Sequence, residues 1–156
     1  MIYNTTVDIS EDSERFEPRD LDIQCTKGSD FLWYIRVKVP IKGDGWNATD
    51  DASGNEARMQ WRSTLDAAST VLDAHTDGTP AFMTINETDP TSLLITVHIP
   101  AADTDSIVFS GASLGTAQGK FRSGGQGVYD LEVVLASGRV FRILEGAVTT
   151  SDEVTR

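Results

Sequence analysis

Hydrophobic and polar residues alternate with a period of two along several stretches of the chain. In residues 31–39 (FLWYIRVKV) the odd positions are apolar, whereas the even positions end in Arg36 and Lys38. The same alternation recurs in residues 57–62, 93–99 and 129–135. Because a period of two places alternate side chains on opposite faces of a strand, each stretch is predicted to be a half-buried β-strand.

Glycine and aspartate separate these stretches at residues 27–30, 42–45 and 77–80, and both residue types favour turns. Many short strands joined by such turns are typical of an all-β sandwich or barrel. We therefore predict an all-β fold, an immunoglobulin-like antiparallel β-sandwich of about 7–9 strands. A jelly roll is the alternative.

The end of the chain predicts a hairpin. Residues 129–135 and 139–144 are two strand-like runs separated by Ala136-Ser137-Gly138, and a three-residue loop that ends in glycine is a common hairpin connection. A bulge is expected at Gly146. Residues 64–75 have weak helical spacing but poor helix formers, so we predict strand or turn there.

Two segments interrupt the strand pattern. Residues 43–56 form a polar acidic loop, and residues 110–127 are rich in glycine, lack acids and contain Lys120 and Arg122. Loops of this length are often functional. The predicted organisation is an extended N-terminal segment (1–20) and a single β-sandwich domain (21–156) with insertions at 43–56 and 110–127.

The net charge and the lengths of the apolar stretches exclude some classes of function. The chain has 156 residues and a formal net charge of −11, the wrong sign for binding nucleic acid or anionic lipid. No stretch is long and apolar enough for a membrane span, and the first residues do not resemble a secretory signal. We therefore expect a protein that is cytosolic or is assembled in the cytosol. Cys25 alternates with polar residues, which predicts a buried core thiol.

Residues that carry chemistry are few. Ser113 lies in a G-x-S-x-G motif, but His75 and His98 both precede it and glycines follow it, so the hydrolase context is missing. Two histidines and one cysteine do not form a typical zinc site. Residues 43–51 depart from the calcium-loop pattern. We predict no enzymatic activity, no cofactor and no metal. His98, on the polar side of its strand, is predicted to face solvent or a partner.

The three tryptophans differ in context. Trp33 and Trp61 lie on apolar strand faces and are predicted to be core residues. Trp46 lies in the acidic loop. It either folds back as a plug or is exposed as an anchor for a partner or a sugar.

Three segments together resemble a family. They are residues 57–62 (ARMQWR), residues 128–133 (VYDLEV) and residues 139–149 (RVFRILEGAVT), which run on to VTR at 154–156. This pattern resembles small tailed-phage and prophage virion proteins with an immunoglobulin-like β-sandwich, similar to the N-terminal domain of upper baseplate proteins. The chain departs from the pattern in the loop 43–56 and the arm 110–127.

The resemblance implies a non-enzymatic virion structural protein, an assembly or adaptor module at the baseplate, neck or fibre attachment. Alternatives are a capsid-decorating cement protein and a carbohydrate-binding module. Partners would be tail, neck or capsid subunits and further copies of the chain, with a trimer as one guess. Residues 2–9 are expected to add to a partner's sheet edge. The candidate partner-binding residues are Ile2, Tyr3, Trp46, Asp50, Asp51, Lys120, Phe121 and Arg122.

Overall fold

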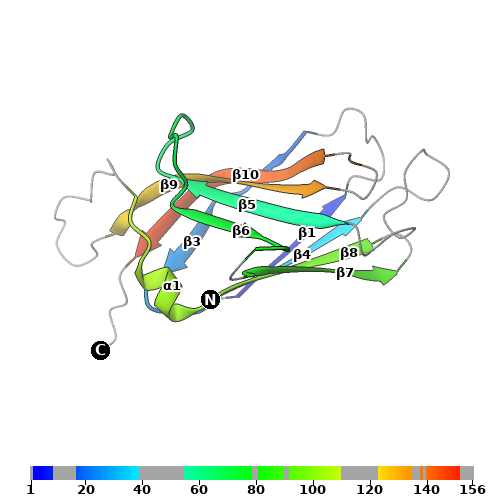
Figure 1. The fold of residues 1–156 in the computed structure, drawn as a ribbon, viewed down its shortest axis with the longest axis horizontal. Coiled ribbons are helices and arrows are strands. Elements are labelled where there is room, and N and C mark those ends of the chain that lie inside the picture. Colours follow the sequence, from blue (N-terminus) through cyan, green and yellow to red (C-terminus); the bar gives the residue numbers. More distant parts are fainter. Residues whose placement is uncertain are drawn as a thin grey trace.

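A computed structural model describes residues 2–8, 17–38, 55–78, 81–89, 92–109, 123–134, 138 and 140–151. Within these ranges most residues lie in β-strands, and the helix α1 (Ala101–Asp105) lies at one end of the molecule (Figure 1). No helix in this part of the chain is long and apolar enough to cross a membrane.

The described strands form two sheets, drawn as two layers in Figure 1. The four-stranded sheet contains, in spatial order, β1 (Ile2–Asp8), β4 (Phe31–Lys38), β8 (Ser92–Ile99) and β7 (Met83–Asp89). The six-stranded sheet contains β2 (Arg19–Asp20), β10 (Val140–Ser151), β9 (Ser123–Val134), β5 (Glu56–Arg62) and β6 (Leu72–His75), and β3 (Ile23–Thr26) also pairs with β10.

The core lies between the two sheets. Trp33 of β4 and Trp61 of β5 are fully buried, as is Cys25 of β3, which confirms the three predictions of burial. Aromatic contacts join the sheets: the ring of Phe31 lies 5.7 Å from that of Trp61, at an interplanar angle of 89°. Edge-to-face pairs of this kind add to the stabilisation from apolar burial.

The strand order is that of an immunoglobulin sandwich. The neighbours β4-β8-β7 correspond to strands B-E-D, and β10-β9-β5 correspond to G-F-C. The all-β sandwich is therefore confirmed. These central pairs are antiparallel, but β1 runs parallel to β4, and β2 and β3 run parallel to β10. Both sheets are thus mixed: their central strands pair antiparallel, and the N-terminal strands β1, β2 and β3 add to them in parallel.

Residues 2–8 pair with their own chain. β1 lies beside β4 along its whole length, and the indole Nε1 of Trp33 donates to Thr5 Oγ1 at 2.9 Å. The Tyr3 hydroxyl accepts a hydrogen bond from the Gln24 N–H of β3 at 3.0 Å. In this structure β1 is therefore the edge strand of the chain's own four-stranded sheet. The addition of residues 2–9 to a partner's sheet stays a prediction.

The predicted C-terminal hairpin is confirmed: β9 and β10 pair antiparallel, and Gly138 between them has a φ of +92° that suits glycine. The bulge is not at Gly146, which stays in register with Tyr129. The register shifts between Arg142 and Leu144 instead. Residues 123–127, part of the glycine-rich segment, begin β9.

Candidate interaction face on the six-stranded sheet

The outer face of the six-stranded sheet carries most of the charged side chains that the structure brings together. On β5 the core-facing residues Ala57, Met59 and Trp61 are buried, so the intervening residues face outward. The register places Arg58 opposite Glu132 of β9. Alternation along three adjacent strands thus aligns rows of polar side chains on one surface, which we call the charged face.

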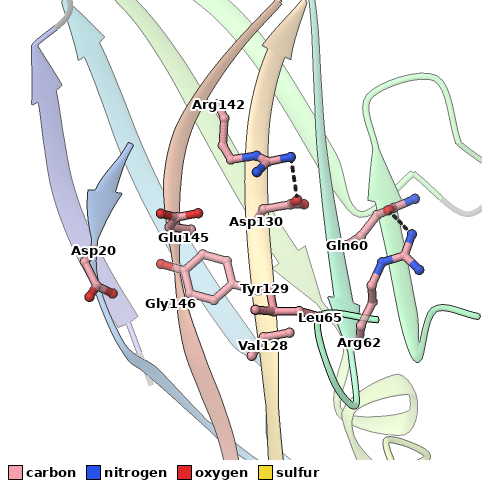
Figure 2. A pocket seen from close by; sticks show the side chains of 10 residues that line it. All are labelled: Asp20, Gln60, Arg62, Leu65, Val128, Tyr129, Asp130, Arg142, Glu145 and Gly146. Carbon is pink, nitrogen blue, oxygen red and sulfur yellow. Dashed lines mark hydrogen bonds and ion pairs between the residues drawn. The ribbon is translucent and has the colours of Figure 1, made fainter. Parts of the chain in front are cut away.

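The charged face contains two adjoining hollows of about 390 and 410 Å³. The first is drawn in Figure 2. Both are lined by Gln60, Arg62, Leu65, Asp130 and Arg142. The first hollow also includes Asp20, Val128, Tyr129, Glu145 and Gly146, and the second includes Arg58 and Glu132. Their shared lining makes them one continuous depression.

Ion pairs cross the charged face from β5 to β10. Arg58 Nε lies 2.9 Å from Glu132 Oε2, and Arg142 Nη2 lies 3.4 Å from Asp130 Oδ2 and 3.6 Å from Glu132 Oε1. The arginine side chains are about half exposed, at 50% and 49%. Pairs this exposed contribute little to stability, and their main effect is to orient the side chains.

Asp130 occupies the middle of the depression. Burial raises the pKa of its carboxyl above the ordinary value, and although the nearby Arg142 opposes this rise, Glu132 adds to it. The Asp130 side chain is 34% exposed, so it has already lost part of its hydration in the isolated chain. Groups that have lost part of their hydration pay less on binding a partner.

Arg62 positions the rim of the depression. Its Nη1 donates to the carbonyl oxygen of Ala67 at 2.6 Å, and its Nη2 donates to Gln60 Oε1 at 2.7 Å. These bonds hold the turn that carries Leu65, whose side chain is 83% exposed. An apolar side chain is thereby presented to solvent at the edge of a charged surface.

A close backbone contact forms the β2 end of the depression. Leu21 N–H donates to the Glu145 carbonyl at 2.8 Å, and the Tyr129 hydroxyl donates to the Leu21 carbonyl at 2.5 Å. Burial, followed by the charges of Asp22 and Asp20, raises the pKa of Tyr129 above its ordinary value. The hydroxyl therefore keeps its proton, and donates this hydrogen bond, throughout the neutral pH range.

Gly146 permits this contact, because an added Cβ would overlap the Leu21 carbonyl. Glu145 precedes Gly146 on β10 and lies in register with Asp20 of β2. Figure 2 shows both carboxylates at the same side of the depression. Neither carboxylate forms an ion pair with another described residue, so both are available to a cation from outside this part of the chain.

Only Ile2 and Tyr3 of the predicted partner-binding residues lie in the described part of the chain, and both are on β1 of the other sheet. Trp46, Asp50, Asp51, Lys120, Phe121 and Arg122 lie outside the described residues.

His98 is exposed, as predicted, and its Nε2 lies 3.0 Å from Asp30 Oδ2. The described residues contain no group of three His, Cys, Asp or Glu side chains that could hold a metal ion.

The charged face is not predicted from the sequence. Its only sequence signal is the polar half of each alternating strand, namely Arg58, Gln60 and Arg62 on β5 with Asp130 and Glu132 on β9. That signal identifies outward positions, but it does not show which strands are neighbours. The face becomes visible only when β5, β9 and β10 are placed side by side.

Comparisons with known proteins found matches among solved structures. No protein-family model and no curated protein matches it. Among solved structures, the N-terminal domain of phage TP901-1 ORF48 aligns over 100% of both chains with 10% identity and a TM-score of 0.37. The ZIG-8–RIG-5 IG1–IG1 heterodimer covers 92% of this chain and 90% of the other, with 9% identity and a TM-score of 0.31. These scores carry no functional argument, and the assignment to a β-sandwich rests on the two sheets.

Proposed function

We propose that this protein is a non-enzymatic structural component of a tailed-phage virion, an assembly or adaptor module on the tail side at the baseplate, neck or fibre attachment. The observation that carries the proposal is the place of the three segments that resemble phage virion proteins. Residues 57–62 lie in β5, residues 128–133 in β9 and residues 140–149 of the third segment in β10, and these three adjacent strands build the charged face.

The chemistry of the charged face suits protein binding. It is an open depression with half-exposed arginines and an apolar side chain, Leu65, at its rim. Arginine is enriched in protein interfaces, and the exposed Leu65 supplies apolar area that a partner could bury. The partners that we propose are tail, neck or capsid subunits and further copies of this chain.

The test is quantitative mass spectrometry of purified particles from the source phage or induced prophage, which counts this chain relative to the major capsid protein. A small fixed number per particle supports a tail-side location. One copy for every few capsid subunits would instead make it a capsid-decorating protein, and absence from particles would overturn the virion proposal.

Two matched variants test the face itself. Leu65 and Val108 are both exposed apolar residues, at 83% and 65%, but only Leu65 lines the depression. Leu65→Asp is expected to reduce incorporation into particles, because it removes the apolar contact at the rim and adds a charged group that must be desolvated when a partner binds. Val108→Asp should be incorporated normally. Equal incorporation of both variants would show that the charged face is not the contact.

A further inference from the structure

Among the described residues, the charged face carries two carboxylates without an ion pair, Asp20 and Glu145, and the outer face of the four-stranded sheet carries an arginine without one, Arg36. We propose that the charged face of one copy binds the outer face of the four-stranded sheet of a second copy. The inference rests on the proposed role of the charged face as an interaction surface, but it does not rest on the virion assignment. Its occupant is a second molecule of this chain, bound in a head-to-tail arrangement.

The outer face of the four-stranded sheet supplies the positive charge. Arg36 and Lys38 are exposed on β4, and because Lys38 lies in register with the acidic Asp8 of β1, the positive charge that matters here is that of Arg36. Arg36 lies between Thr6 of β1 and Leu94 of β8 in the register of the sheet, and it forms no ion pair with any described residue. A guanidinium flanked by neutral neighbours is available to a carboxylate of another molecule.

This positive face is also hollowed. A depression of about 360 Å³ is lined by Asn4, Thr5, Thr6, Tyr34, Arg36 and Leu94. Tyr34 and Leu94 are only partly buried, so the depression offers apolar surface beside the guanidinium. It is suited to an apolar side chain that has a carboxylate nearby.

The charged face presents that combination. Asp20 and Glu145 lie side by side in register without a counter-ion among the described residues, an arrangement of like charges that is unfavourable in the isolated chain. Arg58 and Arg142, in contrast, already pair with carboxylates of the same face. Leu65 stands exposed on the rim of the same depression as Asp20 and Glu145.

The two surfaces lie on opposite sides of the sandwich, because each is the outer face of a different sheet. A contact between unlike surfaces of identical chains is heterologous, and repetition of it gives a ring if the rotation closes or a filament if it does not. The exposed charges that take part make the association weaker at high salt.

The experiment measures self-association of the purified full chain by sedimentation velocity over a series of protein and salt concentrations. The wild type is expected to form species larger than a monomer, which dissociate as salt is raised. Arg36→Glu and Glu145→Lys should each weaken association at least about tenfold. The controls Lys27→Glu and Asp105→Lys make the same changes in net charge outside both depressions, and they should associate like the wild type.

The decisive sample is an equimolar mixture of Arg36→Glu and Glu145→Lys. Because each variant carries the charge that the other has lost, the mixture should associate when neither variant does alone. A wild type that stays monomeric, or a mixture that stays monomeric, overturns the inference. Incorporation into particles is a separate readout: a chain that self-associates but is absent from particles would refute the virion proposal and leave this inference standing.

Discussion

Replacement of Gly146 by alanine should destabilise the fold by detaching the segment that precedes β3 from β10. An added Cβ would meet the carbonyl group of Leu21 and the carboxylate of Asp22. The obstacle is largely backbone, and a backbone segment cannot rotate away as a flexible side chain can. Leu21 and its neighbours must therefore shift outward.

The size of the effect follows from the hydrogen bonds that such a shift breaks. They are Leu21 N–H to the Glu145 carbonyl at 2.8 Å, Ala147 N–H to Asp22 Oδ1 at 3.0 Å, and the Tyr129 hydroxyl to the Leu21 carbonyl at 2.5 Å. At about 1 kcal/mol each, their loss lowers the free energy of unfolding by about 3 kcal/mol. For a chain of this size that corresponds to a fall in Tm of roughly 6–12 °C.

A double-mutant cycle measured by urea denaturation tests this explanation. Tyr129→Phe removes one of the three bonds and should cost about 1 kcal/mol. In the Gly146→Ala background the same change should cost almost nothing, because the bond is already broken. The reasoning is refuted if Gly146→Ala unfolds at the same urea concentration as the wild type, or if the two effects simply add.

Three further outcomes are expected. Cys25 is fully buried and burial raises its pKa to about 11, so a thiol reagent should modify it only under denaturing conditions; rapid labelling of the native protein would contradict its position in the core. Trp33→Phe should destabilise the protein by about 1 kcal/mol more than Trp61→Phe in urea titrations, since Trp33 Nε1 donates to Thr5 Oγ1 whereas Trp61 Nε1 has no acceptor in the described part of the chain. The hydrogen bond to His98 lowers the pKa of Asp30 below 3.8, so the stability that this carboxylate contributes is present above the ordinary aspartate range and is lost as the pH falls through the lowered pKa; Asp30→Asn should flatten the acid limb of the stability curve, and an unchanged limb would exclude this linkage.

The sequence predicts the strands well where one face is buried and the other is solvated. Residues 31–39 alternate cleanly and form β4 at Phe31–Lys38, and the glycine of the C-terminal turn adopts the positive φ that a hairpin of this kind uses. These features are local, because burial period and turn chemistry are properties of a few consecutive residues. Local rules therefore recover the individual strands.

Local rules do not recover how the strands pair. The N-terminal segment has β-forming residues, but nothing in its sequence states that Ile2–Asp8 lies parallel to β4 or that Arg19–Asp20 lies against β10. Likewise, the requirement for glycine at position 146 comes from Leu21, which is remote in sequence. Such contacts depend on the packing of the whole sandwich, so the expected bulge was assigned to the wrong residue of β10.

The same limit explains why the charged face was missed, and it bears on what the face does. Its ion pairs, such as Arg58 with Glu132 and Arg142 with Asp130, join different strands and leave the arginines about half exposed. Because exposed pairs add little stability, the fold gains little from aligning them.

A surface whose charged groups are already oriented loses less side-chain entropy when a partner binds. Asp20 and Glu145 have no ion-pair partner in the part of the chain that the structure describes. Charges of this kind contribute more to partner choice than to affinity. The arrangement thus favours discrimination between partners, which the proposed function would require.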